Sequence, residues 1–521
     1  MRKSVQGEEV MEQSVGALVT QAARKFGDKT ALIVDGKTWS FRQLDQLSSA
    51  LAGSLRARGV GKDSVVALYS PNCAQWVIAY YAVMKLGAVV SPLNLMLTAS
   101  EAAYAIRDCK AVAVLGTLGK LVPLRNEMGA ARVKLVSFTG GGAEIENFSD
   151  LLESEPGAVF PVEGIGIDDL STIGYTSGTT GHPKGAMLSH RSILLNTAMT
   201  STFHVRTEHD VVVSALPCSH VYGNIVMNSA IACGMTLVLH AVFDAKAILS
   251  SIEKYRATLF EGVPTMYLYL LSSPELGEYD VSSLTRCTVG GQTMSAYKMK
   301  EVESRLGVPL LELWGMTELG GLGATHPLYG PRRHGSIGVP LPFMQARIAS
   351  LESREGALPA GEVGELQMKG PLAMQGYFGQ PEATSEAIDR DGWLRTGDLA
   401  YVDDDGFIFV VDRLKDMVIT GGFNIYPAEL ERVLCEHPAV AMAAVVGIPD
   451  ETKGELAKAF VVLKSHAEAD VEGLLEFCRQ RLAAYKVPRL IEVVDDLPKT
   501  SSGKILRRAL REKVAADSQP S

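Results

Sequence analysis

Short runs rich in β-branched residues alternate with helical patterns along the first four hundred residues, and this alternation constrains the fold more than any other feature. Helical segments at 76–86 and 101–108 lie between some of these runs. Strands that alternate with helices pair in parallel through βαβ units. We therefore predict an α/β fold, with a large N-terminal domain of parallel sheets flanked by helices. The runs are residues 64–69, 111–115, 134–138, 211–216 and 236–240.

The C-terminal part of the chain has a different pattern, and 521 residues are too many for one ordinary core. After Gly361, strand-like pieces separated by glycines predict a small β-rich subdomain at about residues 340–412. We place the domain boundary at the end of this subdomain, which gives an N-terminal domain at 1–412 and a small α+β C-terminal domain at 413–521. In the second domain we expect strands at 417–420 and 443–448, helices at 427–435 and 471–484, and a basic tail.

Charge and cysteine content narrow the classes of function. The net charge of -9 gives no electrostatic footprint for nucleic acid or for an acidic membrane surface. The seven cysteines have no paired spacing, which argues against a zinc site or a disulfide framework. The first residues lack the continuous apolar core of a signal peptide. We therefore expect a cytoplasmic protein, and a homodimer is the assembly left open.

One apolar stretch is long enough to consider as a membrane span. Between Asp210 and Asp244 no residue is acidic or basic apart from histidine. Pro217, Asn224 and Gly234 interrupt this stretch. A strand, a polar loop, a short helix and a second strand explain it better. We therefore predict buried α/β core here and no transmembrane segment.

Residues 175–185 read Tyr-Thr-Ser-Gly-Thr-Thr-Gly-His-Pro-Lys-Gly. In such a loop, glycines let backbone N–H groups turn toward an anion, hydroxyl groups donate further hydrogen bonds and a lysine adds a point charge. A Walker A loop is excluded because Pro183 stands where that pattern requires glycine. The alternative to a phosphate-binding loop is a surface turn. The candidate phosphate-binding residues are Thr176, Ser177, Gly178, Thr179, Thr180, Gly181 and Lys184.

This loop resembles, nearly residue for residue, the phosphate loop of the adenylate-forming superfamily of acyl-CoA synthetases, peptide-synthetase adenylation domains and luciferases. The resemblance extends over nearly the whole chain, with further segments in the family's order. It implies an enzyme that uses ATP and Mg²⁺ to activate a carboxylic acid as an acyl-adenylate, releases pyrophosphate, and transfers the acyl group to coenzyme A. It also implies that the C-terminal domain is mobile.

Two further segments resemble the nucleotide site of that family. The Trp-Gly-Met-Thr-Glu segment implies that Trp314 lies on adenine, Thr317 reaches phosphate and Glu318 helps to hold Mg²⁺. Asp398 and Arg413 resemble the family's ribose contacts, and a carboxylate suits a diol. Taken alone, the tryptophan would more often be a core residue, the aspartate a turn residue and the arginine a partner in a surface ion pair.

The C-terminal motif implies a catalytic cation. Residues 498–504, Pro-Lys-Thr-Ser-Ser-Gly-Lys, resemble the segment that brings one lysine into the adenylation site. There Lys504 would neutralise the carboxylate and the charge that builds on the α-phosphate. A basic tail on a solvated helix is the alternative. Lys415 stands at the hinge position of coumarate-type ligases, where the domain pivots to present a loop containing Gly421 and Gly422 to pantetheine.

The pocket segment distinguishes the branches of the family. Amino-acid adenylation domains carry an aspartate there, whereas residues 216–223 of this chain contain no carboxylate. His220 matches the histidine that lines the acyl pocket of acyl- and aryl-CoA ligases, with a core histidine as the alternative. An apolar lining with several glycines fits a fatty or aryl tail. By resemblance the pocket wall includes Tyr222, Gly223, Asn224, Val263, Gly290, Met316, Gly320 and Gly321.

Two positions depart from the family's pattern. Gly291 and Gln292, which we assign to the nucleotide side of the site, lie in a segment where relatives usually have alanine followed by proline and leucine. Ile419 replaces a lysine that luciferase-like members use near the site of thioester formation. The second half-reaction therefore has weaker support in the sequence than the first.

We predict an AMP-forming acyl-CoA synthetase that acts on a medium- or long-chain fatty acid. An aryl-acid CoA ligase is the close alternative, and a ligase that loads a carrier protein is a more distant one. A luciferase-like light-emitting enzyme shares these motifs. Outside the enzymes, a sensor of nucleotide or acyl-AMP built on the same fold is the alternative. The expected partners are a small carboxylic acid, ATP and coenzyme A, and nucleic acid is excluded.

Overall fold

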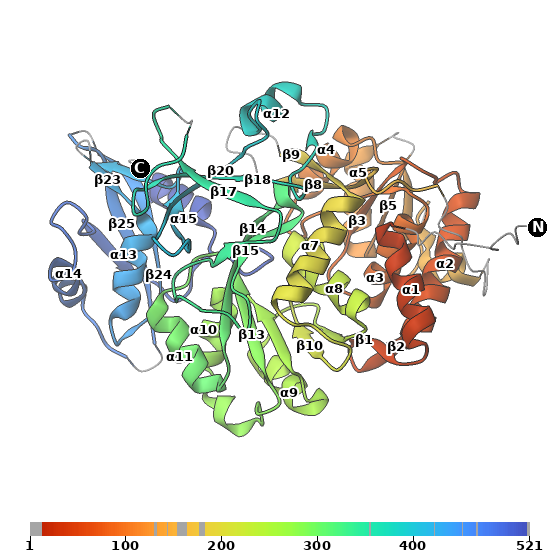
Figure 1. The fold of residues 1–521 in the computed structure, drawn as a ribbon, viewed down its shortest axis with the longest axis horizontal. Helices are drawn as coiled ribbons and strands as arrows, with labels where there is room; N and C mark the ends of the chain where they lie inside the picture. The colour runs from red at the N-terminus through yellow and green to blue at the C-terminus, as the bar shows by residue number, and fades with distance from the viewer. Residues whose placement is uncertain are drawn as a thin grey trace, which may run out of the picture.

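Two large sheets and two smaller sheets organise the chain (Figure 1). The computed structural model of the protein describes residues 13–129, 133–142, 144–153, 164–176, 183–353, 356–420, 423–450, 452–464 and 467–517. The predicted α/β class is confirmed, with parallel-rich sheets in the large N-terminal part and a smaller α+β part at the C-terminal end. In Figure 1 the C-terminal elements, drawn in blue, lie at the opposite end of the molecule from the first helices, drawn in red.

The first large sheet has nine strands within the described part of the chain. Its central strands are parallel, and antiparallel strands occupy its two edges. Parallel pairing follows from the crossover helices, which return the chain to the same edge before each strand. In spatial order the strands are β16 (Val339–Pro340), β15 (Gly321–Thr325), β14 (Leu310–Met316), β13 (Arg286–Gly290), β12 (Leu259–Gly262), β10 (Val211–Ser214), β11 (Thr236–Leu239), β1 (Thr30–Val34) and β2 (Lys37–Ser40).

The second large sheet has a similar plan. From β8 through β4, β3, β5 and β6 to β7, neighbouring strands pair in parallel, whereas β9 forms an antiparallel hairpin with β8. In spatial order the strands are β19 (Gly376–Tyr377), β9 (Lys184–Ser189), β8 (Leu170–Thr176), β4 (Val89–Pro92), β3 (Val65–Tyr69), β5 (Ala113–Gly116), β6 (Lys134–Ser137) and β7 (Glu146–Asn147).

Helices α1 (Val15–Phe26), α3 (Ala74–Lys85), α7 (His190–Phe203) and α8 (Val221–Cys233) pack in the apolar core that the two large sheets share. This core joins side chains of both sheets, such as Leu68 of β3 and Val213 of β10. A helix without a solvent face is apolar all round, and α3 has this character. Even its last residue, Lys85, is buried, with Nζ 2.6 Å from Asp45 Oδ1.

The remaining N-terminal helices cover the outer faces and edges of the two large sheets. Helices α4 and α5 pack on the face of the second sheet that points away from α3, in a separate apolar cluster. These helices are α2 (Phe41–Ala57), α4 (Ala99–Asp108), α5 (Leu118–Met128), α6 (Phe148–Glu153), α9 (Ala245–Tyr255), α10 (Pro264–Ser272), α11 (Ala296–Leu306) and α12 (Pro381–Ala387), with 3₁₀ turns η1 (Pro274–Glu278) and η2 (Thr317–Leu319).

The third sheet is antiparallel and corresponds to the predicted β-rich segment. It consists of β17 (Gln345–Ala349), β18 (Gly364–Lys369), β20 (Leu394–Val402) and β21 (Ile408–Arg413). The fourth sheet consists of β22 (Val418–Thr420), β23 (Phe423–Ile425), β24 (Val440–Asp450), β25 (Gly454–Leu463) and β26 (Leu490–Val493). Helices α13 (Pro427–Glu436) and α14 (Val471–Arg479) pack in one apolar cluster with this sheet and α15 (Arg507–Asp517) in another.

Most of the predicted elements are present, with ends shifted by a few residues. The apolar stretch between Asp210 and Asp244 forms β10, a loop, α8 and β11, as predicted. Among the described residues, no helix combines the length and apolarity that crossing a membrane requires. The predicted helix at 471–484 is wrong at its end, because α14 stops at Arg479. Beyond it the backbone makes turns, including Lys486 N–H to Ala483 carbonyl at 2.8 Å, which bring Leu482 and Val487 into the core.

Candidate active site

Lys504 lies beside His220, although 284 residues separate them in the chain. The Lys504 Nζ is 3.4 Å from His220 Nε2. The lysine is part of a short hairpin at residues 499–505, called here the lysine hairpin, which an antiparallel bridge between Lys499 and Ile505 closes. Within it the Thr500 N–H donates to the Lys504 carbonyl at 2.7 Å. The structure therefore brings the predicted lysine to the predicted pocket histidine on a locally ordered support.

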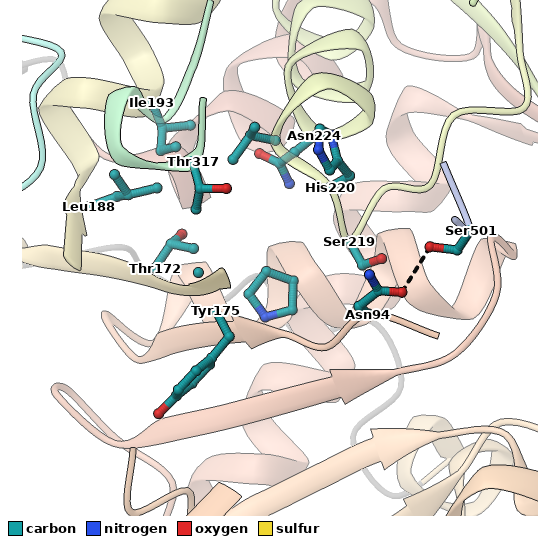
Figure 2. Close-up of a pocket in the computed structure, with 13 residues that line it drawn as sticks. Asn94, Thr172, Tyr175, Leu188, Ile193, Ser219, His220, Asn224, Thr317 and Ser501 are labelled. Atoms are coloured by element: carbon teal, nitrogen blue, oxygen red, sulfur yellow. Dashed lines mark hydrogen bonds between the residues drawn. The ribbon is translucent and has the colours of Figure 1, made fainter. Parts of the chain in front are cut away.

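Two side chains of the N-terminal part hold the tip of the lysine hairpin. The Thr265 hydroxyl, in the first turn of α10, donates to the Gly503 carbonyl at 2.6 Å. The Ser501 hydroxyl donates to Asn94 Oδ1 at 2.8 Å, an interaction marked in Figure 2. Gly503 has a φ of +80°, and a Cβ there would lie 2.9 Å from Val263. The hairpin thus packs too closely for a larger residue at this position.

The segment after β13 contacts the other side of the lysine hairpin. Gly291 has a φ of +90°, and a Cβ there would lie 2.6 Å from Lys504 Cε. Glycine is therefore required for the lysine to pass. The next residue, Gln292, accepts the Ile505 N–H at 3.1 Å through Oε1. Both residues were predicted on the nucleotide side, and in this arrangement both face the lysine hairpin.

The environment of Lys504 makes its charge easier to lose. Burial and the positive charge of Arg413, opposed by the negative charge of Asp398, lower the pKa of Lys504 to about 8. Desolvation penalises the ammonium form because water no longer solvates it. An incoming anion would restore the stability of that form. A lysine with this balance suits a site that binds negatively charged groups.

His220 is neutral and fixed at the beginning of α8. Burial and the charge of Lys504 lower the pKa of His220 to about 3. Its Nδ1 accepts the Tyr222 N–H at 3.2 Å, so the histidine is the N-cap of the helix. A neutral imidazole whose Nδ1 accepts carries its proton on Nε2. The Nε2–H and the ammonium of Lys504 then face each other as two donors, and an anionic oxygen between them would accept from both.

A second constellation joins the first sheet to the third sheet. Trp314, near the end of β14, donates its indole N–H to Asp398 Oδ2 at 2.7 Å. Arg413 Nε lies 3.2 Å from Asp398 Oδ1, because the two residues are directly paired across β20 and β21. The carboxylate is buried, whereas the arginine is half-exposed. Each carboxylate oxygen retains a second lone pair, so Asp398 remains able to accept hydroxyl groups.

Thr317 and Glu318 form the turn after β14. The Thr317 side chain lies so close to β8 that a Cβ on Gly174 would be 2.7 Å from Thr317 Cγ2. Glu318 is buried, and the Tyr377 hydroxyl donates to its Oε1 at 2.9 Å. Burial raises the pKa of Glu318. Lys184, at the start of β9, has its Nζ 5.3 Å from the centre of the Tyr377 ring.

A pocket lies beside His220 and Thr317 (Figure 2). It contains about 620 Å³ of space free of protein atoms, counting the part open to solvent. Polar side chains come from the ends of strands of the second sheet, from the beginning of α8, from the turn after β14 and from the lysine hairpin. The lining residues are Pro92, Asn94, Thr172, Gly174, Tyr175, Leu188, Ile193, Ser219, His220, Val221, Asn224, Thr317 and Ser501.

Several predicted wall residues have other neighbours. The Tyr222 hydroxyl lies 2.6 Å from Thr288 Oγ1 in the buried core behind the pocket. Gly223 lies against the Pro217 carbonyl oxygen, which would be 2.3 Å from a Cβ at this position. The other predicted wall residues outside the lining are Val263, Gly290, Met316, Gly320 and Gly321.

Other residues of the site were missed by the sequence analysis. Ser501 lies inside the C-terminal motif, and this position could have identified it as a residue of the site. Asn94, Thr265 and Tyr377 had no such signal, because only the tertiary fold brings them to the site. Ser177, Gly178, Thr179, Thr180, Gly181, Gly421 and Gly422 lie outside the described residues.

The chain matches known families and proteins along most of its length. The family model of the AMP-binding enzyme matches residues 19–378, and that of the AMP-binding enzyme C-terminal domain matches residues 429–504. A long-chain-fatty-acid–CoA ligase of Bacillus subtilis (strain 168) is 38% identical, with 96% of this chain and 94% of that protein covered. A feruloyl-CoA synthase of Amycolatopsis sp is 37% identical, with 96% and 99% covered.

Solved structures agree with these matches. The anthranilate CoA ligase AuaEII in complex with anthranoyl-AMP has a TM-score of 0.90 at 28% identity, and the match covers 97% of this chain and 98% of that one. ATP-bound MatB from Rhodopseudomonas palustris has a TM-score of 0.88 at 31% identity, with 97% and 100% covered. In both comparisons the likeness extends over the N-terminal and the C-terminal parts of the chain.

These matches cover the two large sheets as well as the C-terminal sheet that carries the lysine hairpin, and the chain belongs to the AMP-binding enzyme family. Within this family it is an AMP-forming acyl-CoA ligase, for which ATP and coenzyme A are substrates together with a carboxylic acid. The prediction of an ATP-dependent acid–thiol ligase is confirmed, and the alternative of a non-enzymatic sensor is not supported.

Proposed function

We propose that this acyl-CoA ligase activates a medium- or long-chain fatty acid. The similarity to the long-chain-fatty-acid–CoA ligase of Bacillus subtilis supports this substrate class. The apolar residues Leu188, Ile193 and Val221 of the pocket would accommodate a hydrocarbon tail. The observation that carries the chemistry is the position of the Lys504 ammonium beside the neutral imidazole of His220.

In the first half-reaction, a carboxylate oxygen of the acid attacks the α-phosphorus of ATP. The bond between the α-phosphorus and the bridging oxygen breaks, and pyrophosphate leaves. Lys504 and His220 would hold the attacking carboxylate, since the site offers two opposed N–H donors to an anionic oxygen. The ammonium also balances the charge that develops on the α-phosphate, which is electrostatic stabilisation of the transition state. Thr317 and the loop at 176–184 would contact the phosphates.

The nucleoside would lie on the third sheet. We assign Trp314 to the adenine and Asp398, with Arg413, to the ribose hydroxyls. The indole N–H and the guanidinium bond fix the Asp398 carboxylate before the nucleotide binds. A carboxylate with a fixed orientation loses less side-chain entropy when it accepts a diol.

Mg²⁺ fits this site as an ion held mainly by phosphate oxygens. Within the described residues, no group of three or more His, Cys, Asp or Glu side chains could hold a metal ion. Glu318 offers a single buried carboxylate, oriented by Tyr377. One carboxylate with nucleotide phosphates and water is a usual environment for Mg²⁺. The ion would screen the phosphate charges, and Glu318 would hold it.

In the second half-reaction, the sulfur of coenzyme A attacks the carbonyl carbon of the acyl-adenylate. The bond from that carbon to the AMP oxygen breaks, AMP leaves, and the thiol proton is released. We infer that the C-terminal domain turns about Lys415 for this step, presenting the loop that contains Gly421 and Gly422. The neighbouring side chains Ile419 and Phe423 are 50% and 57% exposed, so they are free to meet another surface.

The remaining placements complete the proposal. We keep the boundary between the domains at 412–413, beside the end of β21 at Arg413 and before β22 begins at Val418. The β-rich segment at about 340–412 belongs to the N-terminal domain. We place the enzyme in the cytoplasm, where ATP and coenzyme A are available, and keep a homodimer as the candidate assembly.

A panel of acids tests the substrate class. AMP formation that depends on coenzyme A would be measured with fatty acids of increasing chain length and with benzoate- and cinnamate-like acids. The proposal predicts the highest kcat/KM for a medium or long fatty acid. An aryl acid with a higher kcat/KM would establish the alternative, which the similarity to the feruloyl-CoA synthase of Amycolatopsis supports.

A further inference from the structure

Gln292 is the residue by which this chain departs from the family's usual pattern beside the site, and the structure gives it a partner. Its Oε1 accepts the backbone N–H of Ile505 at 3.1 Å. A backbone N–H is always a donor, so the side-chain atom that faces it must be the amide oxygen. The orientation of the Gln292 amide is therefore fixed by its partner. These two residues lie 213 positions apart and on different sides of the domain boundary.

The bond acts on the lysine itself. Ile505 follows Lys504 directly, and its pairing with Lys499 closes the lysine hairpin. On the other side of the bond, Gly291 precedes Gln292 and contacts the Lys504 side chain, as its close approach to Cε indicates. The hydrogen bond between Gln292 and Ile505 therefore fixes the lysine hairpin against the segment that the Lys504 side chain contacts.

Docking of the lysine hairpin has an electrostatic cost. The pKa of Lys504 is lowered mainly because the ammonium is removed from water. Contacts that exist only in the docked arrangement must offset this cost. Besides Gln292, these contacts include the bonds of Thr265 to Gly503 and of Ser501 to Asn94, which hold the tip of the hairpin, and the bond of the Tyr269 hydroxyl to Asp496. Gln292 holds the residue after the lysine, Ile505.

We propose that Gln292 is a positioning residue, which holds Lys504 in the adenylation site by binding the Ile505 amide and thereby favours the domain arrangement of the first half-reaction. This inference rests on the proposed function, in which the C-terminal domain leaves this arrangement before the thiol attacks. A residue that stabilises only the docked arrangement accelerates adenylation and contributes nothing to acyl transfer.

Two substitutions separate this role from a contact with the nucleotide. Gln292→Met keeps the length of the side chain and removes the acceptor, whereas Gln292→Glu keeps an acceptor. Acid-dependent ATP–pyrophosphate exchange measures adenylation, and single-turnover transfer from a preformed acyl-adenylate to coenzyme A measures the second step. Thr293→Ala, at the adjacent exposed residue, is the matched control and should leave both rates unchanged.

For Gln292→Met we expect kcat of exchange to fall roughly threefold to tenfold, as for the loss of one hydrogen bond. The KM for ATP and the rate of acyl transfer should stay at or near the wild-type values, and Gln292→Glu should recover most of the exchange activity. Unchanged exchange in the methionine variant would overturn the proposal. So would a raised KM for ATP at constant kcat, an equal loss in both steps, or a glutamate variant no better than the methionine variant.

Failure of this inference is distinguishable from failure of the proposed function. Wild-type enzyme that exchanges pyrophosphate with a fatty acid upholds the proposed function whatever the Gln292 variants do. If the wild type exchanges only with aryl acids, the substrate proposal fails, and the same comparison of variants is made with that acid.

Discussion

At the scale of single residues, the site depends on two nitrogen donors that face each other, with no acceptor between them in the part of the chain that the structure describes. His220 uses Nδ1 to cap α8 and so carries its proton on Nε2, toward Lys504. Neither group would be placed in this way for the stability of the fold alone, because two facing donors repel each other. The arrangement is stabilised once an anionic oxygen lies between them.

The lowered pKa of Lys504 predicts an alkaline limit to adenylation. The amine must be protonated to act as a cation, and its pKa of about 8 lies below its usual value of 10.5. The kcat/KM of pyrophosphate exchange reports the free enzyme, so it should be constant near pH 7 and fall as pH rises through about 8. Since His220 is neutral throughout this range, its titration does not change the pH dependence of kcat/KM there.

Lys504→Arg provides the control, because a guanidinium keeps its charge over the whole accessible range. This variant should be slower, since the guanidinium differs in shape from an ammonium. Its kcat/KM should not fall between pH 7.5 and 9, whereas the kcat/KM of the wild type should fall roughly tenfold per pH unit above the pKa of Lys504. A wild-type profile that stays flat to about pH 10 would contradict the lowered pKa of Lys504, because an unshifted lysine titrates only near 10.5.

At the scale of elements, the beginning of α8 positions His220 through a close backbone contact. Gly223 lies in the first turn of the helix, and a Cβ there would be 2.3 Å from the Pro217 carbonyl oxygen. The carbonyl cannot move without the loop that leads to His220. The absence of a side chain at Gly223 thus allows the close packing that positions His220.

Gly223→Ala should therefore lower both stability and adenylation. We expect a loss of about 1–3 kcal/mol in the free energy of unfolding, the usual cost of overpacking, measured by urea denaturation. Pyrophosphate exchange of the folded variant should fall as well. Gly119→Ala, in α5, is the matched control, because a Cβ there meets no atom within 4 Å. Equal stability of the two variants would mean that the Pro217 contact does not constrain the helix.

The sequence predicted elements well where local pattern decides them. The predicted runs at 64–69, 111–115, 134–138, 211–216 and 236–240 correspond to β3, β5, β6, β10 and β11, and the proline at the start of α13 marks its first turn. Local pattern failed at the end of α14, where apolar residues continue with helical spacing although the chain turns. There the backbone conformation is determined by the burial of Leu482 and Val487 in the core.

At the scale of the whole molecule, the site is assembled from regions that lie far apart in the chain. The pocket takes residues from the second sheet, from α8, from the turn after β14 and from the lysine hairpin. Motifs recognisable by resemblance predicted His220, Thr317 and Lys504. Asn94, which bonds Ser501 across 407 residues, could not be predicted because such a contact leaves no local pattern.

The same scale explains the different role of Gln292. From the sequence it belonged to the nucleotide side, by its place after two glycines. In the folded chain its amide oxygen binds the lysine hairpin of the other domain. Its assignment to the nucleotide side stays a prediction, and only the docked arrangement of the domains identified its partner.

The most direct test of the account is the replacement of Lys504 by methionine, which keeps an extended side chain and removes the charge. We predict that ATP binding, measured by calorimetry, changes little, and that a preformed acyl-adenylate is still transferred to coenzyme A. Acid-dependent pyrophosphate exchange should fall by about a hundredfold or more, as when one electrostatic donor is removed from a transition state. If Lys504→Met retains more than about a tenth of the wild-type exchange rate, a loss of only about 1.4 kcal/mol, Lys504 is not the cation of the adenylation step.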